Sequence, residues 1–212
     1  MCHALLRDAS LYDVLLKVDR DLAAEARAAG CPCGGVLHSA RYPRKPRGGP
    51  DELGPEFGTR LSFCCATEGC RRRVTPPSVR YLGRRVYLGA VVVLVTAMRA
   101  GLTVRRAAQL REWLGVSVRT LARWQHWWRE TFVASPFWHG MKGRFAPPVE
   151  SSALPAALLE RFVADHARDR LVALLRFLAP LTTRGAGGAR TPRGAGRPAD
   201  DADCRAAGGL VG

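Results

Sequence analysis

Residues 103–128 read TVRRAAQLREWLGVSVRTLARWQHWW, and this stretch decides the fold. Apolar residues recur at helical spacing on both sides of Gly115-Val116-Ser117. The glycine is able to adopt a left-handed turn, the valine is a small apolar plug, and the serine is a favourable N-cap. The stretch therefore predicts two helices joined by a tight turn, with the second helix over 118–128.

A further helix is expected immediately upstream, over residues 86–100. Its apolar run, 86–98, is bounded by arginines and is well short of the roughly 20 residues that a membrane span needs. It therefore predicts a buried core helix that ends at Gly101, followed by a helix that begins after Thr103. On that next helix the residues expected to face inward are Val104, Ala107, Ala108, Leu110 and Leu114. Residues 77–148 are thus expected to form one three-helix domain.

Five of the seven cysteines lie between positions 31 and 70. The pair in Cys31-Pro32-Cys33 is followed about 30 residues later by Cys64, Cys65 and Cys70. Two close pairs of thiols, each on a tight turn and separated by a β-hairpin, are what a structural zinc ribbon requires. A four-thiolate site selects zinc over hard cations and leaves no open position for chemistry. Residues 31–76 are therefore expected to be a small zinc ribbon.

The spacing leaves a choice of ligands. Strand alternation places Phe63 on the same face as Cys65, which favours Cys65 over its neighbour Cys64. His38 is an alternative to one of the thiols. The expected ligands of a structural Zn²⁺ are Cys31, Cys33, Cys65 and Cys70. Reduced cysteines that fill a small core are the alternative without a metal.

The helical stretch resembles the helix-turn-helix of bacterial transposases and related regulators. The resemblance is carried by Ala107-Ala108, then Leu114-Gly115-Val116-Ser117, then Arg119-Thr120-Leu121-x-Arg123-Trp124. A cysteine ribbon ahead of such a domain is also an arrangement of insertion-sequence transposases, in which this half reads the ends of the element. The resemblance covers roughly residues 31–130. The second helix is about three residues longer than in that family, and the first cysteine knuckle is one residue shorter.

If Leu121 faces inward, a rotation of about 100° per residue places Trp124 and Trp128 in the core as well. The opposite stripe has a small residue at its centre, two arginines able to make bidentate bonds to guanine, and a histidine that can donate to a base or a phosphate. With Ser117 at the helix start, the expected DNA-contacting residues of this helix are Ser117, Arg119, Ala122, Arg123 and His126. Three arginines of the preceding helix are better placed for phosphates, namely Arg105, Arg106 and Arg111. A plain three-helix bundle with an arginine-rich surface is the alternative.

A basic run, Arg71, Arg72 and Arg73, leaves the second knuckle directly. It is expected either to grip phosphates or to be a solvated linker.

The flanks complete the organisation. Residues 1–30 form an amphipathic helix with more acidic than basic residues, expected to pack on the rest of the protein or on a second copy in a homodimer. Residues 149–182 form one or two helices with Val163 on an apolar face, and 183–212 form a disordered low-complexity tail.

Composition indicates the partner. The chain of 212 residues has 33 basic and 18 acidic residues, a net charge of +15 and a pI near 10.7. Such an excess usually has a polyanionic partner, here double-stranded DNA. No segment reads as a signal peptide or a membrane span, and an odd number of cysteines argues against a disulfide scaffold. The expected compartment is the cytoplasm, with association to the nucleoid.

Catalysis is not expected. Strand transfer needs three carboxylates around two divalent ions, which that family carries on a separate domain. Glu150, Glu160, Asp165 and Asp169 are spaced as solvated helix positions. The expected protein is mainly α and binds DNA for a mobile element. It is expected to be either an accessory factor, with a transposase or integrase encoded nearby as its partner, or the DNA-binding part of a transposase. The alternatives are a host transcription regulator and a zinc-dependent module that binds RNA or protein.

Overall fold

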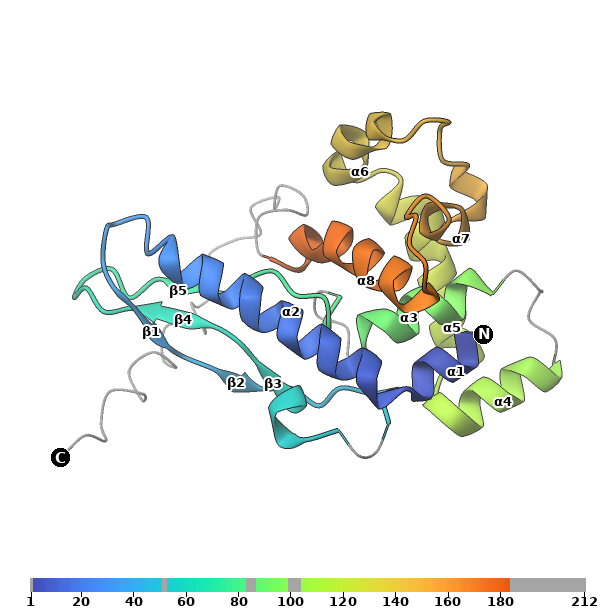
Figure 1. Cartoon of the computed structure of the whole chain (residues 1–212), viewed down its shortest axis with the longest axis horizontal. Helices are drawn as coiled ribbons and strands as arrows, with labels where there is room; N and C mark the ends of the chain where they lie inside the picture. Colours follow the sequence, from blue (N-terminus) through green and yellow to red (C-terminus); the bar gives the residue numbers. More distant parts are fainter. Residues whose placement is uncertain (1, 51–52, 83–86, 99–103, 184–212) are drawn as a thin grey trace, which may run out of the picture.

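The computed structural model describes residues 2–50, 53–82, 87–98 and 104–183. The fold is mainly helical with a small sheet, as predicted (Figure 1). The α-helices are α1 (Cys2–Arg7), α2 (Ala9–Ala28), α3 (Gly89–Ala97), α4 (Val104–Leu114), α5 (Val118–His126), α6 (Pro136–Met141), α7 (Ala156–Leu159) and α8 (Ala167–Leu178). Short 3-10 turns lie at Pro55–Gly58, Lys142–Arg144, Ser151–Ala153 and Ala179–Thr182. Among the described residues, no helix has the length and apolar character to cross a membrane.

The strands are short and form two small antiparallel sheets. They are β1 (Leu37–Ser39), β2 (Tyr42–Pro43), β3 (Thr59–Arg60), β4 (Phe63–Cys65) and β5 (Arg73–Val74). One sheet has the order β1-β4-β5, and the other pairs β2 with β3. Leu37 lies opposite Cys65, and Phe63 lies opposite both Ser39 and Val74. Strands of two or three residues bury little apolar surface on their own. The stability of both sheets therefore depends on the elements that pack against them.

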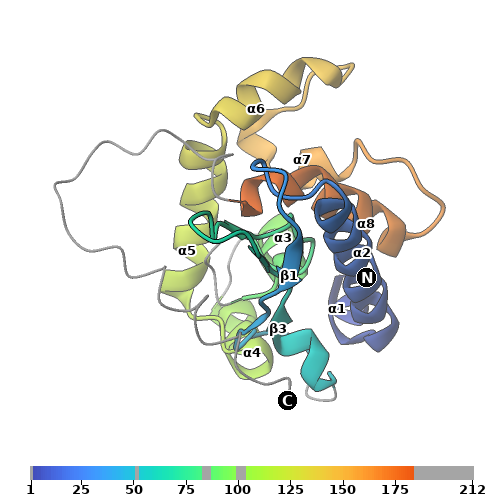
Figure 2. The same ribbon diagram turned by 90° about the vertical axis from the view of Figure 1, so that its left-hand side faces the viewer.

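The centre of the helical part is α3, in which every residue from Gly89 to Val95 is buried. It contacts α1, α5 and α8, so the N-terminal, central and C-terminal helices share one hydrophobic core. Figure 2 shows α2 and α5 on opposite sides of the molecule, with α3 and β1 between them. The prediction of a buried apolar helix is confirmed over Gly89–Ala97, and residues 99–103, where its end was expected, lie outside the described residues.

Several details differ from the sequence predictions. The helix expected over 118–128 is α-helical only to His126 and then widens into a π-helix over Trp127–Phe132. This wider turn brings the Trp127 ring to 5.5 Å and the Trp128 ring to 5.0 Å from the ring of Phe132. Favourable aromatic contacts therefore accompany the change in helical pitch.

Two of these differences concern residues that were predicted to lie on the apolar face of a helix. Ala108 is exposed, because it lies about 200° around α4 from the buried Leu110. Val163 is 97% exposed, because it lies in the non-helical stretch between α7 and α8.

The single helix predicted over residues 1–30 is interrupted at Asp8, which caps α2 by accepting a hydrogen bond from the Ser10 amide. As expected, α2 packs on the rest of the protein, through Leu11, Tyr12 and Leu15. Of the predicted disordered tail, all but Thr183 lies outside the described residues.

Candidate metal centre and the α4–α5 surface

The four predicted cysteines converge on one point. Their sulfur atoms all lie within 4.8 Å of one another, with 3.7 Å between Cys31 and Cys70 and 3.5 Å between Cys33 and Cys65. Tetrahedral zinc with Zn–S bonds of about 2.3 Å places its sulfurs roughly 3.8 Å apart. The cluster is therefore compatible with a metal site. It is the only cluster of three or more His, Cys, Asp or Glu side chains close enough to hold a metal among the described residues.

Two glycine turns shape the site. Gly34 has φ +81° and its amide donates to the Cys31 carbonyl at 2.8 Å. Gly69 has φ +82°, and the amide of the following residue, Cys70, donates to the Thr67 carbonyl at 3.1 Å. These left-handed conformations suit glycine and fold each turn back on itself. Each cysteine pair is thereby presented on a tight turn, as its spacing predicts.

Gly35 is required for a different reason, which is space. A Cβ atom at this position would lie 2.7 Å from the sulfur of Cys65 and 3.3 Å from that of Cys33. The same Cβ would lie closer still to the Thr67 hydroxyl oxygen, so the backbone of the first turn passes directly against Thr67 and the sulfur of Cys65 from the second cysteine segment.

Cys65 rather than Cys64 belongs to the cluster, as strand alternation predicts. Phe63 and Cys65 share the inner face of β4 and pack in the same small hydrophobic cluster. Cys64 points the other way, with its sulfur 3.6 Å from the Arg71 carbonyl. His38 lies opposite Cys64 in the sheet and is not part of the sulfur cluster, so it is not the alternative ligand.

Two cysteines of the cluster have pKa values shifted in opposite directions. A hydrogen bond from the Gly35 amide, with others from the thiols of Cys70, Cys31 and Cys65, lowers the pKa of Cys33 to about 6. A backbone hydrogen bond at Cys33 favours the Cys31 thiolate, but desolvation and thiol hydrogen bonds outweigh it and raise the pKa of Cys31 to about 12. A divalent metal would favour the thiolate form of its cysteine ligands, because ligand thiols bind metal in the deprotonated state.

The turn between α4 and α5 has the conformation that the sequence predicts. Gly115 has φ +62°, and its carbonyl accepts a hydrogen bond of 2.6 Å from the Tyr87 hydroxyl. Val116 is 2% exposed, which makes it the apolar plug. The Ser117 hydroxyl accepts from the Thr120 amide at 3.2 Å and so caps α5.

Helix α5 divides into two faces. Leu121 and Trp124 are buried on one face, which Trp128 of the following π-helix continues, and the Trp124 ring meets that of Tyr87 edge-on at 5.0 Å. The predicted contact residues of the opposite stripe, all on α5, are exposed: Arg119, Ala122, Arg123 and His126. One turn of helix separates the two arginines, so both project from the same side.

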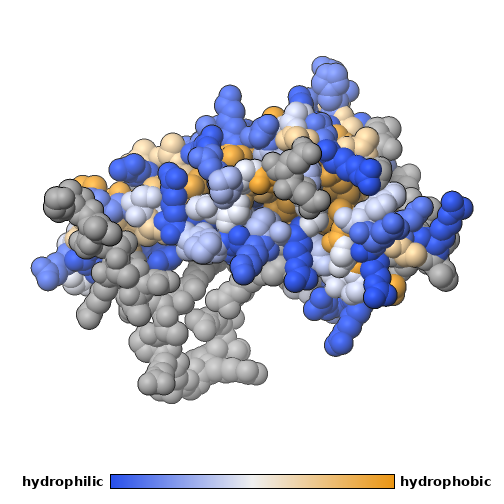
Figure 3. Space-filling view, turned by 90° about the horizontal axis from the view of Figure 1, so that it is seen from below, coloured by the Kyte–Doolittle hydropathy of each residue, from blue (hydrophilic) through white to orange (hydrophobic). Residues whose placement is uncertain are grey.

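The other predicted contacts are placed as follows. Arg105 and Arg111 are exposed on α4, and the side chain of Arg106 lies outside the described residues. In the run that follows the second knuckle, Arg71 and Arg72 are exposed, whereas Arg73 is half-buried with its guanidinium 5.6 Å from the Tyr42 ring centre. Viewed from below, strongly hydrophilic side chains project from the end of the molecule that holds α4 (Figure 3).

A buried ion pair was missed by the sequence reasoning. Asp19 of α2 and Arg80 have fully buried side chains, with 2.8 Å between Asp19 Oδ2 and Arg80 Nε. The same carboxylate accepts from the Ser78 hydroxyl at 2.6 Å and the Val79 amide at 2.7 Å. The guanidinium also donates to the Thr59 carbonyl at 3.0 Å, so the network ties α2 to β3 and to the segment that follows β5.

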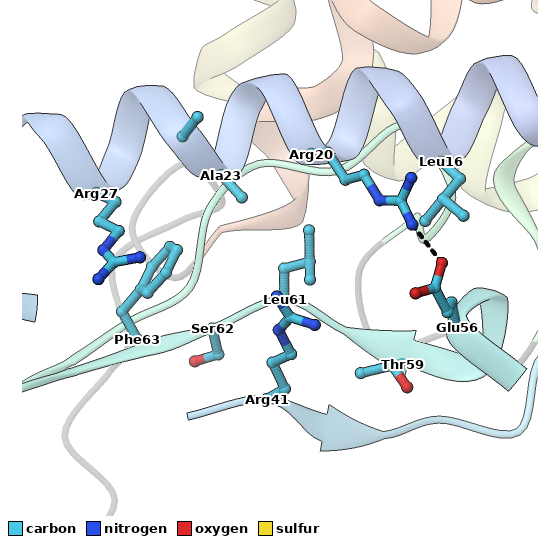
Figure 4. Close-up of a pocket in the computed structure, with 11 residues that line it drawn as sticks. Leu16, Arg20, Ala23, Arg27, Arg41, Glu56, Thr59, Leu61, Ser62 and Phe63 are labelled. Atoms are coloured by element: carbon cyan, nitrogen blue, oxygen red, sulfur yellow. Dashed lines mark hydrogen bonds and ion pairs between the residues drawn. The ribbon is translucent and has the colours of Figure 1, made fainter. Parts of the chain in front are cut away.

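A pocket of about 310 Å³ lies between α2 and the β3–β4 strand segment (Figure 4). Leu61 and Phe63 form its apolar side. At one end Arg20 reaches from α2 to Glu56 in an ion pair, and Arg27 stands at the other. The sequence carries no signal for this pocket, because it depends on how α2 crosses the sheet.

No protein-family model matches the chain, and no curated protein or solved structure is significantly similar to it.

Proposed function

We propose that this protein binds duplex DNA, with α4 and α5 acting as a helix-turn-helix. The observation that carries the proposal is the two-faced character of α5. Its inner face is anchored by Leu121 and Trp124, while its outer stripe exposes two arginines around a small alanine. A helix held rigidly by one face and presenting a narrow basic stripe on the other suits the major groove.

The charge of this region supports the same reading. Residues 77–150 hold twelve basic residues (Arg or Lys) against three acidic ones, Glu112, Glu130 and Glu150. Arg119 and Arg123 have the geometry to bond to guanine O6 and N7, and His126 extends the stripe by one turn. Arg123 is already oriented by a hydrogen bond of 3.2 Å to the Thr120 hydroxyl.

The remaining arginines would act on the backbone of the duplex. Arg105, Arg106 and Arg111 of α4 would contact phosphates, which position the protein without specifying sequence. Arg71, Arg72 and Arg73 would extend these contacts from the sheet. The proposed metal is Zn²⁺ held by four thiolates, a closed structural site that fixes the cysteine turns and carries no chemistry.

The biological setting that we propose is a mobile element. The supporting evidence is the resemblance of 31–130 to a transposase-type ribbon followed by a helix-turn-helix. A host transcription regulator would bind DNA through the same base and phosphate contacts. An integrase-like reading frame beside the gene, or terminal inverted repeats around it, would support the mobile element, and their absence would favour the regulator.

The direct test is selection from a pool of random duplexes at physiological salt. Wild-type protein should enrich a motif. Arg119→Ala and Arg123→Ala should each cost about 1–3 kcal/mol at that motif and relax sequence choice. Arg105→Ala should weaken all sequences evenly and flatten the salt dependence by about one unit. Arg176→Ala, an exposed arginine of α8, serves as the matched control and should change neither property.

Two outcomes would contradict the proposal. If wild-type protein enriches no motif, α5 is not a recognition helix. If Arg119→Ala, Arg123→Ala and Arg105→Ala lower affinity equally and leave the motif unchanged, the stripe is an unspecific basic surface. Binding to single-stranded RNA but not to duplex DNA would favour the RNA-binding module instead.

A further inference from the structure

An exposed apolar side chain stands at the first position of α5. Val118 is 57% exposed, one of four exposed large hydrophobic residues among the described ones, with Val36, Trp113 and Val163. The helix cap does not require it, because the Ser117 hydroxyl and the Thr120 amide complete the cap. A valine whose side chain faces water at this place is unexplained by the fold.

The neighbours of Val118 define what it would touch. Ala122 lies one helical turn further on and is exposed, so the two side chains form a short apolar strip. Arg119 and Arg123 border this strip at the same spacing. The adjacent hydroxyls do not compete for contacts, because those of Ser117 and Thr120 lie 3.0 Å apart and bond to each other.

This surface is too small and too charged for a protein partner. Two small apolar side chains bordered by two arginines bury little area, whereas interface cores exclude charge and prefer large aromatic residues. The major groove of DNA offers a better match, because it displays single methyl groups between hydrogen-bonding edges. The C5 methyl of thymine is the apolar group exposed there.

We infer that Val118, together with Ala122, packs on thymine methyl groups and makes thymine a specified base next to the guanines read by Arg119 and Arg123. The inference rests on the proposed DNA binding and adds a residue and a base to it. The first turn of a recognition helix enters the groove most deeply, and Val118 is the first residue of that turn. The exposed side chain of Val118 would therefore gain its apolar contact, a thymine methyl group, only in the complex with DNA.

The test separates the methyl group from the rest of the base. After the motif has been selected, each thymine in it is replaced in turn by uracil, which keeps the base pair and removes only the C5 methyl. Wild-type protein should lose about 3- to 5-fold in affinity at one or two positions, as expected for one buried methyl. At the same positions Val118→Ala should bind thymine and uracil almost equally.

Two further variants guard the interpretation. Val118→Thr retains one methyl in a similar shape and should keep part of the discrimination. Val163→Ala removes an exposed valine far from α5 in the chain and should leave the uracil profile of wild type unchanged. Circular dichroism should be the same for all variants, since none of these side chains is buried.

The outcomes distinguish this inference from the proposed function. Enrichment of a motif whose thymines all tolerate uracil overturns the role of Val118 and leaves DNA recognition standing. Uracil sensitivity that persists in Val118→Ala also overturns it and assigns the methyl contact to another residue. Failure to enrich any motif overturns both.

Discussion

The two hydrophobic clusters of this protein differ in what holds them together. The helical part has a continuous core that includes Trp124, Trp128, Phe132 and Trp138, together with residues 90–95 of α3. The sheet has a small cluster of Ala23, Cys31, Leu37, Leu61, Phe63 and Cys65, and two of these are cysteines of the candidate metal site. The helical part buries enough apolar surface to fold by packing alone, whereas the sheet does not.

This difference indicates two sources of order in one chain. In the sheet, cysteines that would otherwise fill a core form the candidate metal site, so order there is expected to come from metal–sulfur bonds. In the helical part, order comes from aromatic contacts, such as the one between the rings of Trp128 and Phe132, whose centres lie 5.0 Å apart. The two parts meet at the buried pair Asp19–Arg80.

The largest expected effect is that of metal removal. Structural zinc supplies on the order of 10 kcal/mol of apparent binding free energy in small domains. A strong chelator should therefore abolish the hydrogen-exchange protection of β1, β4 and β5. The tryptophans all lie between positions 113 and 138, so their fluorescence reports only the helical part and should remain native.

Elemental analysis should find one zinc per chain. Cys65→Ser should reproduce the effect of the chelator, while Cys64→Ser should retain the metal because Cys64 lies outside the sulfur cluster. If zinc-free protein retained full hydrogen-exchange protection in β1, β4 and β5, the sheet would not depend on a metal and would not differ from the helical part in this respect.

The next largest effect is a loss of stability at the junction, the buried ion pair Asp19–Arg80 where the two parts meet. Asp19→Asn leaves the Arg80 guanidinium buried without its counter-charge, and breaking a buried pair in this way costs about 3–5 kcal/mol. Denaturant titration followed by tryptophan fluorescence measures this loss. Asp13→Asn, an exposed position on the same helix, is the control and should change stability by less than about 0.5 kcal/mol. A small effect of Asp19→Asn would mean that the junction is hydrated or adaptable.

Local patterns predicted much of this structure. Strand alternation identified Cys65 over Cys64, and the Gly115-Val116-Ser117 pattern located the turn, its plug and its cap. These inferences succeed because the deciding interactions lie within a few residues of each other. The positions of Leu121, Trp124 and Trp128 followed from helical periodicity for the same reason.

Features that join distant segments were not predictable. Asp19 and Arg80 are 61 positions apart, and nothing in either neighbourhood marks them as partners. The pocket between α2 and Phe63 depends on how a helix crosses a sheet. The π-helix after His126 arises where several aromatic rings pack together, which competes with regular helical pitch.

A smaller effect is expected at Gly35. A methyl group there would meet the sulfurs of Cys65 and Cys33, so Gly35→Ala should displace the second turn and weaken metal binding by about 10-fold, or about 1.4 kcal/mol. Competition with a chromogenic chelator measures the change. Gly54→Ala is the matched control, because nothing lies within 4 Å of its added methyl. Equal affinity in both variants would show that the metal site is loose enough to absorb the methyl group.

The smallest effect tests whether the helical part is independent of the metal. Ser117→Ala removes the cap of α5 and should cost about 1 kcal/mol, the usual value of a lost N-cap hydrogen bond. Thr131→Ala, an exposed position after α5, should cost less than about 0.5 kcal/mol. Because the cap lies in the part held by aromatic packing, the cost of Ser117→Ala in denaturant titrations should be the same with zinc bound and with zinc removed. A cost that changes by more than about 0.5 kcal/mol on metal removal would show energetic coupling between the two parts, as expected for sites that are not independent.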